Sequence, residues 1–226
     1  MLSQIFNQIY ILPILLFSVI IHEISHGYAA LKLGDPTARD SGRLTLNPIP
    51  HIDLWGSIIV PLLSLLMAGQ IFIAWAKPVP INPLNFSDYK RDELIVSAVG
   101  PLSNLVMAFA CTMITIGLLQ LQPILGAAAA SSPLYVFLLR MFFGGISLNV
   151  MLGIFNLVPI PPLDGSHVLE AFLPDSVAAS YSRIGFMGIL LIVLLLQVPA
   201  FTGIFNGVIG LFYDPLRNLV MSFAGN

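Results

Sequence analysis

Long apolar runs divide the chain into five segments, which are separated by short stretches rich in proline, glycine and charged residues. The segments cover approximately residues 9–33, 54–75, 94–120, 134–158 and 184–212. Each is close to or longer than the ~20 residues that a helix needs to cross the hydrocarbon layer of a bilayer. The pattern therefore predicts an all-α polytopic membrane protein with about four to six transmembrane helices.

The second segment, 54–75, is a weak candidate for a straight span. It contains three helix breakers, Gly56, Pro61 and Gly69. A proline inside a helix costs roughly 3 kcal/mol unless packing compensates for it. We therefore expect this segment to be a candidate re-entrant element, which enters and leaves the membrane on one face.

The connection before it, residues 34–53, is rich in turn-forming residues. These surround a short strand-like run at residues 43–46, Arg-Leu-Thr-Leu. Runs of this kind bounded by turn formers are typical of strands. The sequence thus predicts a small β element at the membrane surface.

Composition strengthens the membrane assignment and excludes several other classes. Hydrophobic residues make up 57% of the chain, charged residues 9%, and the mean hydropathy is +0.93. Soluble domains carry about 25% charged residues. The net charge of −2 comes with no basic tract that would suggest nucleic acid, and the single cysteine, Cys111, excludes a cysteine-rich zinc site. With no long soluble stretch, we expect residues 1–226 to form one membrane-embedded core.

Three ionisable side chains stand at the end of the first apolar run. The sequence His22-Glu23-Ile24-Ser25-His26 directly follows residues 9–21, which carry no charge. Ionisable groups inside a membrane cost about 2.5 to 3.5 kcal/mol each, so they persist when something compensates for them. A bound metal ion is the obvious compensating partner.

Helical spacing supports a metal site at this position. Residues four apart lie on one face of a helix, so His22 and His26 can reach one ion. Glu23 projects roughly 100° away, which suits a general base that acts beside the metal without binding it, as in other H-E-x-x-H hydrolases. The alternative is a buried pair of hydrogen-bonded histidines without a metal.

A hydrolytic zinc ion takes three protein ligands and leaves one position open. Asp164 is the best candidate for the third ligand because it is the one acidic residue directly at the broken end of an apolar segment. It follows Pro159, Pro161 and Pro162, which forbid a regular helix there.

Taken together, these motifs resemble the site-2 protease family of intramembrane zinc metalloproteases. The likeness extends from about residue 15 to 170 and rests on four motifs: His22-Glu23-x-x-His26, Lys77-Pro78-Val79-Pro80-x-Asn82, Gly100-Pro101-x-x-Asn104, and Asn156-x-x-Pro159-x-Pro161-x-Leu163-Asp164-Gly165. The chain looks like the compact members without a PDZ or other regulatory domain.

The resemblance implies roles for particular residues. It implies that His22, His26 and Asp164 bind one Zn²⁺ ion and that Glu23 is the catalytic acid and base. It also implies that Asn156, eight residues before Asp164, positions the substrate or the attacking water.

Three further polar residues have alternative roles. Asn104 is a candidate for substrate or oxyanion positioning, although hydrogen bonding between helices is the commoner reason for an amide in a membrane. His167 follows Asp164 by three residues and is more simply a surface histidine. His51 lies in the first connection, and its spacing requires no part in the site.

The sequence therefore predicts a zinc metalloprotease that cleaves membrane proteins within or near their transmembrane segments. The alternative is a divalent-metal transporter or metal-binding membrane protein that uses the same His/His/Asp site. A transit site has no need for a carboxylate such as Glu23 that does not bind the metal. Substrate identity and oligomeric state stay open.

Counting spans gives a prediction about topology. Five full spans would put His22 and Asp164 at opposite membrane faces, whereas a re-entrant 54–75 brings them to the same face. The second arrangement places seven basic residues on one side, Lys32, Arg39, Arg43, Lys77, Lys90, Arg91 and Arg183, and leaves Arg140 and Arg217 on the other. The positive-inside rule then predicts an outside N-terminus and an active site nearer the cytoplasmic face of a prokaryotic plasma membrane.

Overall fold

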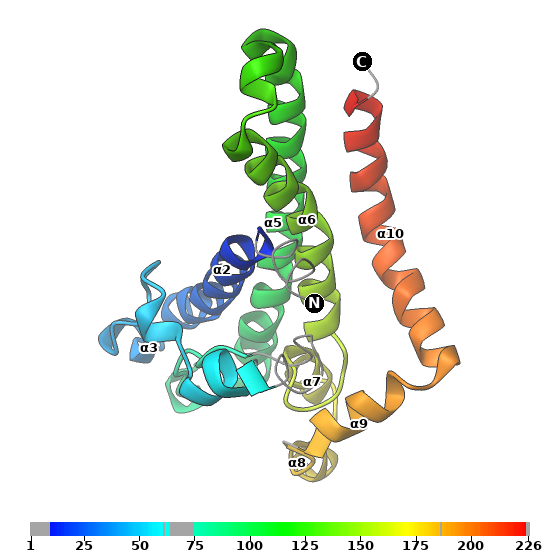
Figure 1. Ribbon diagram of the computed structural model, residues 1–226. Helices are drawn as coiled ribbons and strands as arrows, with labels where there is room; N and C mark the ends of the chain where they lie inside the picture. Colours follow the sequence, from blue (N-terminus) through cyan, green and yellow to red (C-terminus); the bar gives the residue numbers. More distant parts are fainter. Residues whose placement is uncertain (1–9, 61, 64–74, 186, 225–226) are drawn as a thin grey trace.

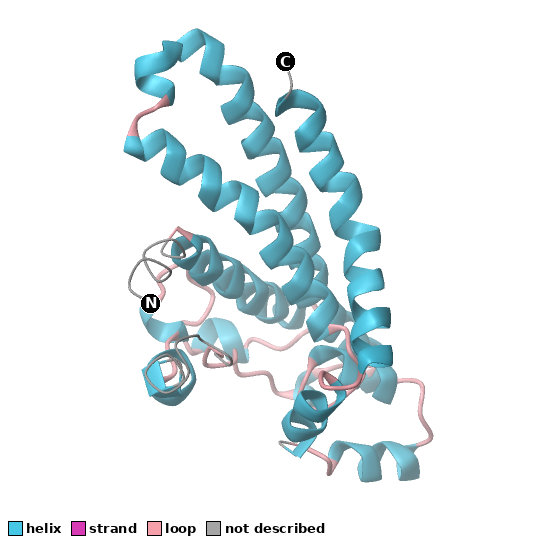
Figure 2. Cartoon of the chain, turned by 45° about the vertical axis from the view of Figure 1, so that its right-hand side comes forward, coloured by secondary structure: helices cyan, strands magenta, loops and turns pink. Residues whose placement is uncertain are grey.

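A computed structural model describes residues 10–60, 62–63, 75–185 and 187–224. Within these ranges the chain is all-α and contains no strand, as Figure 2 shows by its cyan helices and pink connections. Three long helices form the centre: α2 (Ile11–Lys32), α5 (Tyr89–Ala130) and α6 (Pro133–Asn156). The predicted all-α class is confirmed for the described part of the chain.

Further helices surround these three. They are α3 (Thr37–Asp40), the 3-10 helices η1 (Ile49–His51) and η3 (Pro83–Asn85), the π-helix η2 (Leu54–Ile59), α7 (Asp164–Glu170), α8 (Asp175–Ser182), α9 (Met187–Leu195) and α10 (Pro199–Ala224). The fifth apolar segment is thus divided between α9 and α10. Figure 1 shows α10 running beside α5 and α6.

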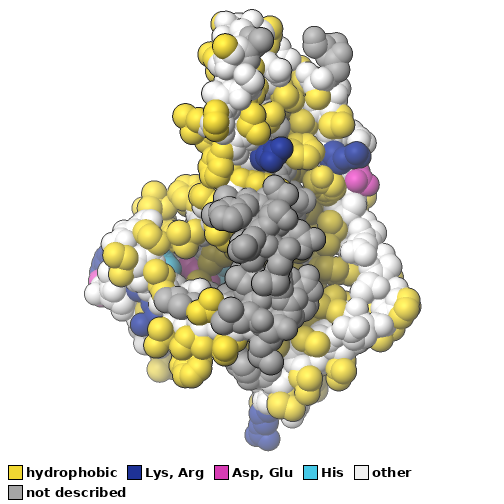
Figure 3. All heavy atoms as spheres, in the orientation of Figure 1, with side chains coloured by type: hydrophobic (Ala, Val, Ile, Leu, Met, Phe, Trp, Pro, Cys, Tyr) yellow, Lys and Arg dark blue, Asp and Glu magenta, His cyan; other side chains and the backbone are white. Residues whose placement is uncertain are grey.

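Three of the described helices are long and apolar enough to cross a membrane. They are α2, the Tyr89–Gly126 part of α5, and α6. The helix α5 bends at Gly126, where φ is 75°, a conformation that glycine adopts at little cost. Large apolar side chains cover the outside, including Val106, Ile204 and Leu211, each at least 67% exposed. Figure 3 shows that such side chains dominate the described part of this face, as expected for contact with lipid.

The relative directions of the three central helices follow from which residues contact one another at two levels along them. At one level Ile14 of α2 packs with Cys111 of α5 and Ile146 of α6. Further along α2, His26 contacts Val96 of α5, and further along α6, Gly153 lies against the carbonyl of Pro101 of α5. Residue numbers therefore rise together along α2 and α6 and fall along α5, so α2 and α6 are parallel and α5 is antiparallel to both.

One local expectation is wrong. Residues 43–46 form an irregular stretch with bends at 44–46 rather than a strand, and they have no partner strand in the described residues. The helix α5 continues through Gly100 and Pro101, since Pro101 lies in its interior and Gly126 is its non-helical position. The expected re-entrant segment lies largely outside the described residues, because 61 and 64–74 are not among them.

Candidate metal centre

The structure brings together the three residues that the sequence predicts as metal ligands. The Nε2 atoms of His22 and His26 lie 3.0 Å apart, and Oδ2 of Asp164 lies 3.1 Å from the first and 3.4 Å from the second. Within the described residues these three form the group of donor atoms close enough to hold one metal ion. Two imidazoles and a carboxylate are a ligand set that zinc accepts.

The two histidines reach this point because α2 turns them toward the interior. Both are buried, with 8% and 7% of His22 and His26 exposed. Their rings meet edge to face with centroids 4.7 Å apart. The four-residue spacing has therefore placed both rings on one face of a regular helix, as predicted.

The other nitrogen of each ring is held by an oxygen on α5. Nδ1 of His22 lies 2.6 Å from Oδ1 of Asn104, and Nδ1 of His26 lies 2.7 Å from the carbonyl oxygen of Val96. A carbonyl can only accept, so in this arrangement Nδ1 carries the proton and donates. This leaves the lone pair of each Nε2 directed at the shared point, which is the tautomer that binds a metal.

Gly100 gives the two rings the space they occupy. A Cβ atom at this position would lie 2.2 Å from Nε2 of His26 and 2.9 Å from Cε1 of His22. Any larger residue would push the rings away from Asp164. Gly100 belongs to a sequence motif, but the sequence alone indicates no function for it, because the contact depends on how α5 packs against α2.

Asp164 enters the site as the first residue of α7, directly after the proline-rich segment. Gly165 allows the chain to fold back there, since a Cβ would lie 2.2 Å from the carbonyl oxygen of Leu157. The Oδ2 atom of Asp164 is buried and has no hydrogen-bond donor. An orphaned carboxylate oxygen that faces two imidazole nitrogens fits a metal ion well.

The charge balance at Asp164 also suits a cation. Burial raises the pKa of this carboxyl, but hydrogen bonds and positive charge from protonated Nε2 atoms of His22 and His26 hold it well below its usual range, and a bound cation would take the place of those protons. Asp164 is therefore ionised at neutral pH and available as an anionic ligand.

Glu23 lies beside the ligands without being one of them. Its Oε2 atom accepts a hydrogen bond of 2.8 Å from the backbone N–H of Val79. Residues 77–82 thus cross next to the metal centre. This stretch is one of the motifs of the family resemblance, but its sequence does not indicate a contact with Glu23.

The other polar residues singled out in the sequence are not members of the group formed by His22, His26 and Asp164. Asn104 is fully buried, and its Nδ2 donates to Oδ1 of Asn149 at 3.1 Å, so its amide is engaged on both sides. Asn156 is half-buried at the end of α6 and donates to the carbonyl of Leu152 at 3.0 Å. His51 is buried away from the three ligands and contacts the carbonyl of Thr45 at 2.9 Å.

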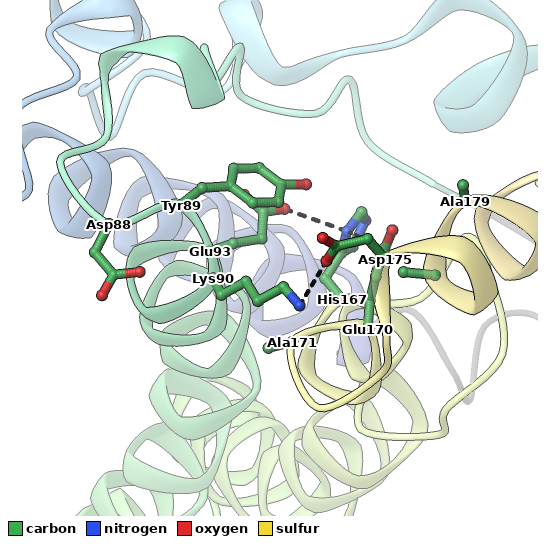
Figure 4. A pocket seen from close by; sticks show the side chains of 10 residues that line it. Asp88, Tyr89, Lys90, Glu93, His167, Glu170, Ala171, Asp175 and Ala179 are labelled. Carbon is green, nitrogen blue, oxygen red and sulfur yellow. Dashed lines mark ion pairs between the residues drawn. The ribbon is translucent and has the colours of Figure 1, made fainter.

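His167 faces a separate pocket of about 540 Å³ next to the metal centre (Figure 4). Its Nδ1 lies 3.2 Å from Oε1 of Glu93 and 3.7 Å from Oε2 of Glu170. Lys90, which also lines the pocket, forms an ion pair of 2.7 Å with Asp175. His167 therefore pairs with acidic side chains instead of completing the group formed by His22, His26 and Asp164.

Comparisons with known proteins agree with this chemistry. Residues 116–196 match the family model described as Peptidase family M50. The chain is 38% identical over 193 residues to a Bacillus subtilis protein named "Putative zinc metalloprotease YwhC", covering 84% of this chain and 81% of that protein. It is 30% identical over 203 residues to "Putative zinc metalloprotease Rip2" of Mycolicibacterium smegmatis, covering 88% and 71%. No solved structure matches the chain.

Proposed function

Because this chain belongs to peptidase family M50, the site-2 proteases, and is a zinc metalloprotease, we propose that it cleaves peptide bonds of other membrane proteins within or near their transmembrane segments. The observation that carries this proposal is the position of the ligand pair. His22 and His26 lie on α2, one of the helices long and apolar enough to cross a membrane. A peptide bond must come to that depth to be cut.

In this proposal His22, His26 and Asp164 hold the zinc ion. A zinc ion bound there would act as a Lewis acid that polarises the peptide carbonyl and makes water a stronger nucleophile. Asn104 and the carbonyl of Val96 keep both imidazoles in the binding tautomer, as their 2.6 and 2.7 Å contacts support.

Glu23 is the proposed general base and acid. Oε2 accepts from Val79, which leaves Oε1 to take a proton from the attacking water and deliver it to the leaving amine. Since the carboxylate lies next to the ligands on the same helix, it reaches the reacting atoms without binding the metal itself.

Asn156 is the proposed substrate-positioning residue. Its amide now donates to Leu152 of its own helix, a bond that a substrate carbonyl can replace at similar cost. Asn104 is less suited to this task, since it is fully buried and engaged by His22 and Asn149. We therefore propose that Asn104 positions His22 rather than the substrate.

The topology that accompanies this function includes a re-entrant segment at 54–75. Its described ends support this, because the N–H of Trp75 donates to the carbonyl of Gly56 at 3.1 Å. The C-terminal end of α2 and the N-terminal end of α5 also meet at the metal centre, so the chain between them crosses the membrane an even number of times. The positive-inside rule then favours an active site near the cytoplasmic face.

A metal-transport function is not favoured. Transit requires ligands that release the ion, and it gives no role to a carboxylate that lies beside them. Glu23 is oriented by a backbone donor and is not among the three clustered ligands. Both relatives are also named as zinc metalloproteases, which favours proteolysis over transport.

The test is cleavage of a single-span model substrate by the full chain in liposomes. We expect cuts within or near the hydrophobic segment, mapped by mass spectrometry. Glu23→Gln should slow cleavage at least about 100-fold while zinc stays bound, whereas Asp164→Ala should lose zinc as well. The exposed Asp40→Asn serves as a matched control and should behave like the wild type. Cuts confined to soluble loops would overturn the proposal.

A further inference from the structure

The segment that contacts Glu23 is fixed to the rest of the protein at several points. We define the strap as residues 77–85, which run without regular secondary structure into η3. Pro78 and Pro80 have no N–H to donate. The N–H of Val79 between them donates to Oε2 of Glu23 at 2.8 Å. The strap therefore contacts the proposed base through one backbone donor.

Close packing holds Val79 against the helix that carries the metal ligands. Val79 is 6% exposed. A Cβ added to Gly27 would lie 2.9 Å from Cγ1 of Val79 and 2.7 Å from Cδ2 of Leu44. The glycine after His26 thus lets the strap lie directly on the backbone of α2, which fixes the distance from Val79 to Glu23.

One buried carboxylate fixes the far part of the strap. Asp35 is fully buried in the loop after α2. Its Oδ2 accepts from the N–H of Asn82 at 2.7 Å, and its Oδ1 accepts from Nδ2 of Asn85 at 2.7 Å. Oδ1 also accepts from the N–H and hydroxyl of Thr37, at 3.1 and 2.5 Å. In the described part of the chain Asp35 has no ion pair, so these donors alone compensate for its charge.

The near end of the strap is fixed by the connection that precedes η2. The N–H of Lys77 donates to the carbonyl of His51 at 2.9 Å. The carbonyl of Lys77 accepts from Nη2 of Arg43 at 2.6 Å, and Arg43 is itself buried. Val79 is therefore held between two anchored points of the chain, Lys77 and Asn82.

From this arrangement we propose that Asp35 is a positioning residue for Glu23. By anchoring Asn82 and Asn85, it keeps the N–H of Val79 on Oε2 and so leaves Oε1 directed at the reacting atoms. This inference rests on the proposed role of Glu23 as general base. It adds that a carboxylate in the loop after α2 sets the rate of the proton transfer without contacting the substrate.

The first experiment compares Asp35→Ala and Asp35→Asn with wild type in liposomes. We expect Asp35→Ala to lower kcat at least tenfold, with KM and zinc per protein unchanged. Asp35→Asn keeps a carbonyl acceptor and should lose less. The matched control is Asp40→Ala, since Asp40 is exposed and pairs with the adjacent Arg39. An unchanged kcat, or loss of zinc together with activity, would overturn the proposal.

A second pair of variants tests the contact between Val79 and Glu23 even if Asp35→Ala fails to fold. Val79→Pro removes the donor. Because Val79 already precedes Pro80, its backbone is restricted to β and polyproline conformations, and proline adopts the second of these. Val79→Ala removes side-chain packing but keeps the donor. We expect kcat to fall at least tenfold in the first and to change less than threefold in the second. Equal effects of both variants would sink the proposal.

An increase in kcat would also be informative. If the contact with Val79 restrains Glu23 in an inactive position, Val79→Pro and Asp35→Ala would raise kcat, which contradicts positioning. Failure of the proposed function has its own signature, since wild type and Glu23→Gln would then cleave the transmembrane substrate equally slowly. A fast wild type with a slow Glu23→Gln and an unaffected Val79→Pro would overturn the strap proposal alone.

Discussion

The Nδ1 atom of His22 and the Oδ1 atom of Asn104 lie 2.6 Å apart, in the interior between α2 and α5. The amide of Asn104 is held in turn by Asn149 of α6 at 3.1 Å. A proposed metal ligand on one helix is thus oriented by an amide on the second, which is oriented by an amide on the third. Contacts of this kind fix the ligand's tautomer and typically raise metal affinity.

Asn104→Leu should therefore weaken zinc binding by about 10- to 100-fold, because His22 loses the acceptor that selects its tautomer. The measurement is zinc affinity by competition with a chelator, alongside cleavage rate at saturating zinc. Ser103→Ala is a suitable control, since Ser103 is adjacent and its hydroxyl donates to the carbonyl of Gly100 of its own helix at 2.6 Å. Equal zinc affinity in Asn104→Leu and wild type would show that His22 is oriented by other means.

Gly100→Ala should disturb the metal centre by steric clash with the histidine rings. The added Cβ would lie 2.2 Å from Nε2 of His26, and a ring held at Nδ1 by Val96 has little freedom to move. We expect at least a tenfold loss in zinc affinity. Gly117→Ala on the same helix has no atom within 4 Å of the new Cβ and should instead stabilise α5 by about 0.5–1 kcal/mol. Zinc content of the two variants after dialysis checks the contrast.

The clustering of the three candidate ligands could be predicted from the sequence because it follows from short-range geometry. Four-residue spacing on a helix brings His22 and His26 together whatever surrounds them. The prediction of Asp164 also required the proline-rich break that follows an apolar segment. The structure then brings all three donor atoms within 4.8 Å of one another.

The contacts between helices could not be predicted in the same way. The roles of Gly100 and Val79 depend on which faces of α2, α5 and the strap meet, and hydrophobic periodicity does not determine that. The strand expected at 43–46 illustrates a related error. Arg43 resembled a residue in a surface strand, but its guanidinium is buried against the strap and fixes an irregular backbone.

Asp35 should make a pH-dependent contribution to stability. Burial raises the pKa of this carboxyl, but hydrogen bonds from Thr37, Asn82 and Asn85 outweigh that effect and lower it below its ordinary value. A lowered pKa contributes stability that is complete above about pH 4, the ordinary Asp value, and is lost as the pH falls through the folded value.

Asp35→Asn should therefore lower the thermal midpoint in detergent by a constant amount between pH 8 and about pH 5. The difference from wild type should shrink as the pH falls below about 4. The loss at neutral pH should be about 1–3 kcal/mol, the usual cost of leaving a buried donor without its charged partner. A difference that grows toward acid pH would contradict the hydrogen-bonded anion.

Cleavage should depend on how easily the substrate helix unwinds. In a helix each peptide carbonyl is bonded to an N–H, so the scissile bond must leave the helix before Glu23 and the metal can act on it. Gly or Pro near the cut site should raise kcat/KM, and a poly-Leu replacement should lower it. Substrates with matched hydrophobic length isolate this effect from membrane insertion. Equal rates for all three would count against local unwinding.

The last prediction concerns the membrane topology around residues 54–75. The ends of this segment meet through the bond between Trp75 and Gly56, and α2 and α6 run parallel with both ligand motifs at the same end. If the segment is re-entrant, the connections on either side of it lie on the same membrane face.

Cysteine labelling tests this arrangement. Single cysteines are placed at the exposed positions Ser41 and Ser87, in a protein whose buried Cys111 is replaced by alanine. Both should react with a membrane-impermeant reagent only from the cytoplasmic side. A cysteine at Ser131, in the exposed turn between α5 and α6, should react only from the opposite side and serves as the control. Labelling of Ser41 and Ser87 positions from different sides would mean that 54–75 crosses the membrane, and the parallel arrangement of α2 and α6 could then not hold in the bilayer.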